Sequence, residues 1–217
     1  MLKKAAVILA GCGNQDGAEV TETVGTLIAL SQFKVEYQCF APDLNFEPKN
    51  FITKQNLPEK RNVLVEAARL TRGQIQSTQN LKVDEFDALV LPGGFGVAVN
   101  LCSWALAGAS CEVLPEIEKV ILDFYASQKP IGAICIAPCL VARVLGNHHI
   151  TVTVGSDAKA MAEVRRTGAF AVECAVQDYV ADRDHKILSS PAYMLPATPF
   201  DVFKGVNGMI KELAEMA

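Results

Sequence analysis

The sequence predicts an α/β protein with a mostly parallel sheet covered by helices on both faces. Short strands that are apolar throughout, such as residues 87–91 and 130–134, alternate with amphipathic helical segments. The 217 residues are 50% hydrophobic and 20% charged, which is enough to bury a core without disulfides or a structural metal. We therefore expect one large domain over residues 1–217.

The N-terminal half is expected to begin with a buried strand that a Gly-rich turn, Gly11-Cys12-Gly13, brings to an end. Pro42 ends the next strand, and three prolines without clear periodicity predict a loop after it. Gly73 closes the helix that follows this loop. The expected elements are a strand at 5–10, a helix at 18–31, a strand at 35–41, a loop at 42–61 and a helix at 61–72.

The C-terminal half continues the same alternation and closes on a helix. We expect strands at 87–91, 130–134 and 150–154, short strands at 169–176, 179–182 and 186–190, and helices at 114–127, 135–145, 158–167 and 200–216.

The first residues also fit a second hypothesis. Two lysines, an apolar stretch and Leu-Ala-Gly-Cys ending at Cys12 resemble a short lipoprotein signal. The apolar stretch is short for a signal, and similar strands recur downstream without preceding lysines. We therefore favour a buried strand.

Composition excludes several classes of function. The net charge is −4 and no cluster of four or more lysines and arginines occurs, so a nucleic-acid partner is not expected. No apolar run approaches the length of a membrane span. Seven cysteines without a Cys-x-x-Cys pair predict free thiols in a reducing compartment, hence a cytoplasmic protein. Three histidines offer little for zinc, and we expect no metal or cofactor.

Cys135 is the strongest candidate for a nucleophile. Ligands of parallel sheets bind beyond the carboxyl ends of the strands, which points to the loops 11–17, 92–100 and 135–138. Cys135 lies between a strand and a helix, the position of a nucleophile elbow. The helix N-terminus favours a thiolate, so we expect a lowered thiol pKa. A small buried structural cysteine is the alternative.

Other residues of these loops are weaker candidates. Glu22 near a helix start is typical of a solvated residue, and Gly94 of Pro92-Gly93-Gly94 could belong to an ordinary turn or an oxyanion hole. Asn100, Cys12 and His148 are possible accessory residues, Cys12 as a redox partner of Cys135. His148 or His149 could serve as a base for Cys135, although a solvated turn is favoured for both, and His185 is expected at a hairpin tip.

Several motifs together resemble the ElbB family, the "enhancing lycopene biosynthesis" or isoprenoid-biosynthesis proteins with an amidotransferase-like domain. This family belongs to the PfpI-like branch of the class I glutamine-amidotransferase superfamily. The resemblance covers nearly the whole chain and implies a single flavodoxin-like domain, a three-layer α/β/α sandwich. The motifs are Gly11-Cys12-Gly13, Asp16-Gly17-Ala18-Glu19, Arg61-Asn62-Val63-Leu64, Pro92-Gly93-Gly94-Phe95-Gly96, Cys135-Ile136-Ala137-Pro138 and Pro191-Ala192-Tyr193.

The resemblance implies roles for four residues. Cys135 matches the elbow cysteine, Glu22 the glutamate that hydrogen-bonds its thiol, and the N–H groups of Gly94 and Ile136 the oxyanion hole. Ile136 stands where peptidase members have His, and the His-x-Glu of glutaminases is missing, so neither activity is expected.

The remaining Cys–Glu pair is similar to that of cofactor-independent glyoxalases. The implied activity converts small 2-oxoaldehydes such as methylglyoxal and glyoxal to 2-hydroxy acids. The alternatives are a non-enzymatic redox-sensing or stress-response protein and an accessory protein of isoprenoid metabolism. We expect a homodimer or higher homo-oligomer, because apolar stretches at 97–99 and 101–107 would otherwise be exposed.

Overall fold

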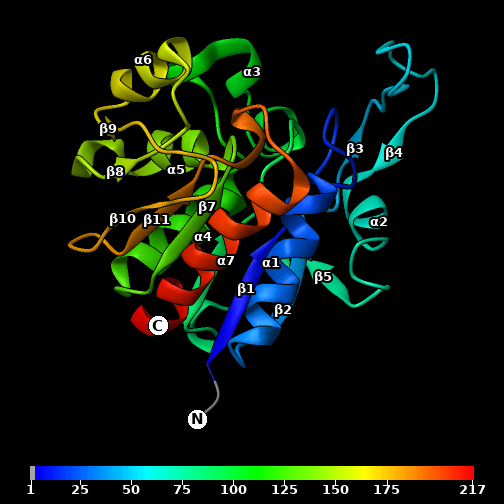
Figure 1. Ribbon diagram of the computed structural model, residues 1–217. Helices are drawn as coiled ribbons and strands as arrows, with labels where there is room; N and C mark the ends of the chain where they lie inside the picture. Colours follow the sequence, from blue (N-terminus) through cyan, green and yellow to red (C-terminus); the bar gives the residue numbers. More distant parts are fainter. Residues whose placement is uncertain (1–2) are drawn as a thin grey trace.

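A twisted seven-stranded sheet forms the centre of the computed structural model, which describes residues 3–217 (Figure 1). The strand order is β10-β11-β7-β6-β1-β2-β5, and every neighbouring pair is parallel except β10 with β11. The strands are β1 (Lys4–Ile8), β2 (Glu36–Ala41), β5 (Ile75–Ser77), β6 (Ala88–Leu91), β7 (Ile131–Ile134), β10 (Val180–Asp182) and β11 (Ile187–Ser190).

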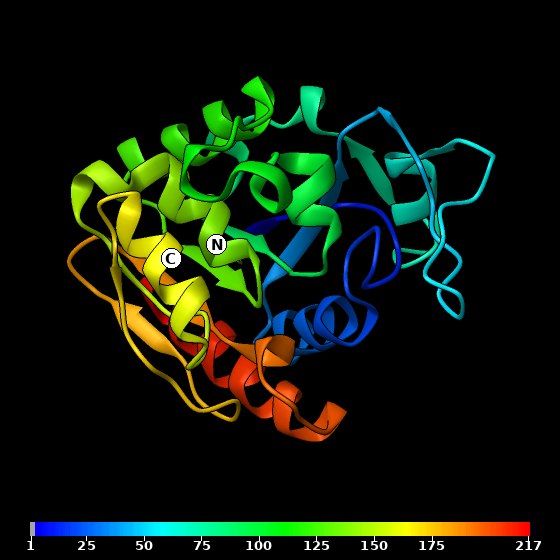
Figure 2. The ribbon, with the colours of Figure 1, turned by 90° about the horizontal axis from the view of Figure 1, so that it is seen from above.

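Helices cover both faces of this sheet (Figures 1 and 2). Helices α1 (Val20–Gln32), α2 (Val63–Ala67) and α7 (Pro199–Met216) bury their apolar residues on one face. Helices α4 (Pro115–Ala126), α5 (Ala137–Leu145) and α6 (Ala158–Arg166) bury theirs on the other. The expected three-layer α/β/α arrangement with a mostly parallel sheet is confirmed.

Strand β1 shows why the strands are apolar throughout. Ala5 and Val7 pack in the core beneath α1 and α7, whereas Ala6 and Ile8 pack in the core beneath α4 and α5. All four are almost completely buried. Because alternate residues of a strand point to opposite faces, a sheet covered on both sides leaves no position in β1 for a polar side chain.

The segment between β2 and β6 differs from the prediction. The expected loop at 42–61 contains an antiparallel pair, β3 (Asn45–Phe46) with β4 (Arg61–Asn62), in an arm that projects beyond the sheet (Figures 1 and 2). The expected helix at 61–72 is reduced to α2. Asn62 is its N-cap residue, whose side chain accepts the N–H of Val65, and the chain turns after Ala67. The edge strand β5 was not predicted, since three residues show no periodicity.

Two further regions depart from expectation. Residues 92–114 contain a π-helical turn (Val97–Leu101) and α3 (Trp104–Ala107). Val97, Ala98 and Leu101 of this apolar segment are buried within the chain, whereas Val99 and Leu106 are exposed and available for an interface. The strands expected at 150–154 and 169–176 are shorter and pair with each other outside the main sheet, as β8 (Thr151–Val152) and β9 (Phe170–Ala171).

The N-terminal strand forms as favoured above. Lys4–Ile8 is β1, in the middle of the sheet between β2 and β6. Met1 and Leu2, which begin the signal-like stretch, lie outside the described residues. Within residues 3–217, no helix combines the length and the apolar character needed to cross a bilayer.

Candidate active site

Cys135 occupies a sharp turn between β7 and α5. Its φ of 62° is in the left-handed region, a backbone conformation that residues other than Gly rarely adopt. Its backbone N–H donates to the Ser190 carbonyl oxygen at 2.9 Å, and Pro138 lies in the first turn of α5, which begins at Ala137. Such backbone strain persists where surrounding contacts hold it and is common at active sites. The turn presents the thiol beyond the carboxyl end of β7.

Glu22, in the first turn of α1, is completely buried against this thiol. One carboxyl oxygen, Oε2, accepts the N–H of Gly93 at 3.0 Å. The other, Oε1, accepts the N–H of Tyr193 at 3.4 Å. The carboxyl group also lies beside the Cys135 thiol, and each group shifts the pKa of the other. Both β1, which precedes α1, and β7 end at this edge of the sheet, and this common edge brings the two residues together.

Gly93 is required where these two side chains meet. A Cβ at this position would lie 2.6 Å from Glu22 Oε2 and 2.7 Å from the Ile134 carbonyl oxygen, and it would also collide with the Cys135 side chain. No side chain can be accommodated there without moving the pair.

Burial governs the protonation of the pair. It raises the pKa of Glu22 to about 8, and the nearby Glu19 carboxylate adds to this increase. Burial also raises the pKa of the Cys135 thiol, as does the adjacent Glu22. Because either anion raises the pKa of the other group, the pair holds at least one proton near neutral pH.

The expectation of a lowered thiol pKa was therefore wrong in direction. It considered only the helix N-terminus, whereas Cys135 is 8% exposed and lies against a carboxyl group. Two groups oppose the increase: the backbone N–H groups of Gly94 and Ile136 lower the thiol pKa, because an N–H dipole favours the thiolate. These are the two N–H groups that the resemblance implies for an oxyanion hole.

A cavity of about 490 Å³ opens in front of the Cys135 thiol. Its lining is mostly apolar. Besides the Cys135 thiol, the polar side chains of the lining residues are the Asn14 amide, the Glu19 carboxyl group and the Tyr193 hydroxyl. The cavity can hold a small, largely uncharged ligand beside the sulfur. The lining residues are Asn14, Glu19, Gly94, Phe95, Cys135, Ile136, Tyr193 and Met194. Sequence reasoning did not single out Asn14, Glu19 or Met194 as site residues.

Asn100 and Cys12 lie near the site without lining this cavity. The Asn100 amide donates to the carbonyl oxygens of Ala10, at 3.0 Å, and Asp16, at 2.8 Å, which ties the π-helical turn to the loop after β1. Asn100 therefore supports the site instead of entering it. The pKa of Cys12 is raised by burial and by Glu66, and the structure does not pair this thiol with Cys135.

The three histidines lie away from Cys135. His148 follows the C-terminal end of α5, about 13 Å of helix from the elbow at its start, and its ring contacts the Tyr125 ring at a tilt of 44°. His149 contacts the Gly168 carbonyl oxygen through Nδ1 at 3.1 Å. His185 precedes β11, so it lies at the amino-terminal ends of the parallel strands, whereas Cys135 lies beyond their carboxyl ends. Its Nδ1 pairs with Asp182 at 2.9 Å. None of them is placed to act as a base for the thiol.

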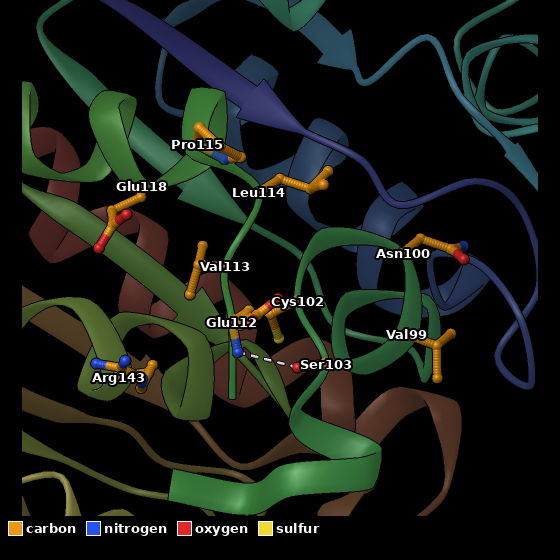
Figure 3. Close-up of a pocket in the computed structure, with 10 residues that line it drawn as sticks. All are labelled: Val99, Asn100, Cys102, Ser103, Glu112, Val113, Leu114, Pro115, Glu118 and Arg143. Carbon is orange, nitrogen blue, oxygen red and sulfur yellow. Dashed lines mark hydrogen bonds between the residues drawn. The ribbon is translucent and has the colours of Figure 1, made fainter. Parts of the chain in front are cut away.

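A separate cavity of about 570 Å³ lies between the π-helical turn and α4 (Figure 3). In Figure 3 Arg143 and Glu118 lie on one side of it and Asn100 on the other. Its cysteine, Cys102, has a pKa raised to about 12 by burial, so the thiol stays neutral at physiological pH. Unlike Cys135, this thiol has no carboxyl group among the neighbours that shift its pKa. Within residues 3–217, no three His, Cys, Asp or Glu side chains cluster as metal ligands would.

Comparison with known proteins agrees with the motifs. The rat (Rattus norvegicus) "ES1 protein homolog, mitochondrial" is 35% identical over 227 residues, which cover 98% of this chain and 84% of the rat protein. The human (Homo sapiens) "Glutamine amidotransferase-like class 1 domain-containing protein 3, mitochondrial" is 34% identical and covers 98% of this chain and 83% of its own.

A solved structure is similar along the whole chain. It is an "isoprenoid biosynthesis protein with amidotransferase-like domain" from Ehrlichia chaffeensis, 36% identical with a TM-score of 0.93, covering 99% of both chains. The resemblance drawn from the motifs is thereby confirmed. The model of the DJ-1/PfpI family matches residues 4–190. The chain belongs to the DJ-1/PfpI family.

Proposed function

We propose that this protein is a cofactor-independent glyoxalase that converts small 2-oxoaldehydes to 2-hydroxy acids. The observation that carries the proposal is the buried contact between the Cys135 thiol and the Glu22 carboxyl group, at the base of a mostly apolar cavity. This pair supplies a nucleophile and one proton carrier, which is all that an internal aldehyde-to-acid rearrangement requires.

In the first step the Cys135 sulfur adds to the aldehyde carbon of methylglyoxal. The pair reacts in the form that holds one proton, on Glu22, after the thiol proton has left to water. The carbon–sulfur bond forms from the thiolate, the carbonyl π electrons move to oxygen, and Glu22 gives its proton to that oxygen and becomes a carboxylate. The product is a hemithioacetal. The Gly94 and Ile136 N–H groups stabilise the oxygen while it carries negative charge.

In the second step the Glu22 carboxylate removes the proton from the former aldehyde carbon and returns a proton to the neighbouring carbon through an enediol. The first carbon is oxidised and the second is reduced, so no external oxidant or hydride carrier enters. The result is a thioester of the 2-hydroxy acid on Cys135. Water then attacks the thioester carbon, the carbon–sulfur bond breaks, and lactate leaves as the sulfur recovers its proton.

The pKa of Glu22 suits these alternating roles. A carboxyl group with a pKa of about 8 is mostly protonated in the resting protein, so it can donate to the aldehyde oxygen first. Its conjugate base is then stronger than an ordinary carboxylate, which favours proton removal from carbon.

The test is lactate formation by the purified protein with methylglyoxal. Lactate must be measured directly, because all seven cysteines are free thiols able to form reversible hemithioacetals that deplete methylglyoxal without turnover. We expect lactate from the wild type and none above background from Cys135→Ala. Glu22→Gln should form lactate at least about 10²-fold more slowly, because it cannot relay a proton.

Cys174→Ala is the matched control. Cys174 is a free, partly exposed thiol outside the Cys135 cavity, so this variant should make lactate at the wild-type rate. Equal lactate formation by wild type and Cys135→Ala would contradict the proposal. No lactate at all, combined with selective oxidation of Cys135 by peroxide, would favour the redox-sensing alternative.

A further inference from the structure

Glu19 is a second carboxyl group at the Cys135 cavity, and the reaction above does not use it. It is half-buried, lines the cavity and is the N-cap residue of α1. Its Oε2 accepts the N–H of Glu22 at 2.7 Å. Its own N–H donates to the Gly93 carbonyl oxygen at 2.9 Å. Glu19 is thus fixed between the first turn of α1 and the turn that carries Gly94.

The negative charge of Glu19 is not neutralised by a cation. Among the ion pairs of residues 3–217, none includes Glu19 or Glu22. Burial raises the pKa of Glu19, and the backbone N–H groups of the first helical turn oppose this increase by favouring the carboxylate. Lys49 is the cation near this end of the cavity, and its Nζ lies over the Phe95 ring, 5.4 Å from the centroid.

Glu22 consequently faces one charged neighbour. Cys135 contacts it from the elbow, Glu19 from its own helix, and the other contacts are the backbone N–H groups of Gly93 and Tyr193. Glu19 is the only fixed charge in this set. A like charge on the same helical turn makes ionisation of a buried carboxyl group less favourable.

We propose that Glu19 is a positioning residue of the Cys135–Glu22 pair, whose carboxylate fixes the start of α1 and whose negative charge keeps the shared proton on the pair. The raised pKa of Glu22, to which Glu19 contributes after burial, agrees with this role. The inference rests on the proposed function for its catalytic meaning, but the protonation itself can be measured without turnover.

The test is the pH titration profile of the Glu22 carboxyl group, measured by carbon-13 NMR of protein labelled at the glutamate carboxyl carbons. Glu19→Gln keeps an oxygen acceptor for the Glu22 N–H and removes the charge. We expect it to lower the midpoint of the profile by about one pH unit. Glu19→Asp keeps both the charge and a favourable N-cap, so its midpoint should remain at the wild-type pH.

Two further variants complete the design. Glu118→Gln removes an exposed carboxylate from the first turn of α4, outside the Cys135 cavity, and should leave the midpoint unchanged. Glu19→Ser also removes the charge, and Ser is a favoured N-cap residue. This variant takes the place of Glu19→Gln if the latter does not fold.

An unchanged midpoint in the neutral variants would overturn the inference, as would an equal shift in Glu19→Asp, which would assign the effect to the cap geometry. If the wild type makes no lactate while the neutral Glu19 variants still lower the midpoint, the proposed function fails and the role of Glu19 stands.

Discussion

Substitution of Glu22 by Gln should change how the stability of the protein depends on pH. The carboxyl group has its ordinary pKa of 4.5 in the unfolded chain and a pKa of about 8 in the folded protein. Between these values the folded state binds a proton that the unfolded state has lost. The stabilisation from this proton is therefore complete below about pH 4.5 and is lost as the pH rises through 8.

The size of this effect follows from the two pKa values. A difference of about 3.5 pH units, at about 1.4 kcal/mol per unit, corresponds to roughly 5 kcal/mol of unfolding free energy. No discount for solvent screening applies, because Glu22 is completely buried. Glu22→Gln removes this dependence, since an amide does not titrate.

The variant should also lose one hydrogen bond at low pH. Both carboxyl oxygens accept backbone N–H groups, from Gly93 and Tyr193, whereas an amide has one oxygen. The unpaired N–H costs about 1–2 kcal/mol. At pH 5 we therefore expect Glu22→Gln to be less stable than the wild type, and at pH 8.5 to be at least as stable.

Urea unfolding at several pH values between 5 and 8.5 measures this crossing, with Glu118→Gln as the exposed control that should follow the wild type. If the stability difference between wild type and Glu22→Gln were the same at every pH, Glu22 would have an ordinary pKa and the protonated pair would not exist.

Three other predictions concern the surroundings of the site. Gly93→Ala should destabilise the protein by about 1–3 kcal/mol in urea unfolding, because the added Cβ overlaps both members of the pair; an unchanged unfolding free energy would refute the close packing. Asn100→Ala should cost about 2 kcal/mol in urea unfolding, because two buried carbonyl oxygens lose their donor, whereas a cost below 0.5 kcal/mol would show that the clamp is dispensable. We also propose that the chain forms a homodimer, so sedimentation equilibrium at micromolar concentration should give twice the chain mass of 23.3 kDa, and a monomer there would contradict it.

The sheet could be predicted because burial on both faces leaves a clear signal in short strands. Residues 88–91 and 130–134 are apolar at every position, and the strands expected at 87–91 and 130–134 form β6 and β7 within a residue of the expected bounds. Strand β5 could not be found in this way, because Ile75–Ser77 is at the edge of the sheet and only partly buried. Its position depends on pairing with β2, which no local pattern encodes.

The site was partly predictable for a similar reason. The position of Cys135 between a strand and a helix indicated the elbow, and the resemblance indicated Glu22 as its partner. The direction of the thiol pKa could not be obtained from the same pattern, because it depends on burial and on a carboxyl group 113 positions away in the sequence. His148 shows that closeness in sequence does not bring a residue to the site. It follows the C-terminal end of α5, whereas Cys135 precedes the N-terminal end of the same helix.

The central claim is that Glu22 holds a proton against Cys135 in the resting protein. Carbon-13 NMR of protein labelled at the glutamate carboxyl carbons observes this proton directly, and the resonance missing from Glu22→Gln identifies Glu22. We predict that this resonance has the protonated chemical shift at pH 6 and titrates with a midpoint of about 8. A Glu22 resonance already at the ionised position at pH 6 would contradict the claim.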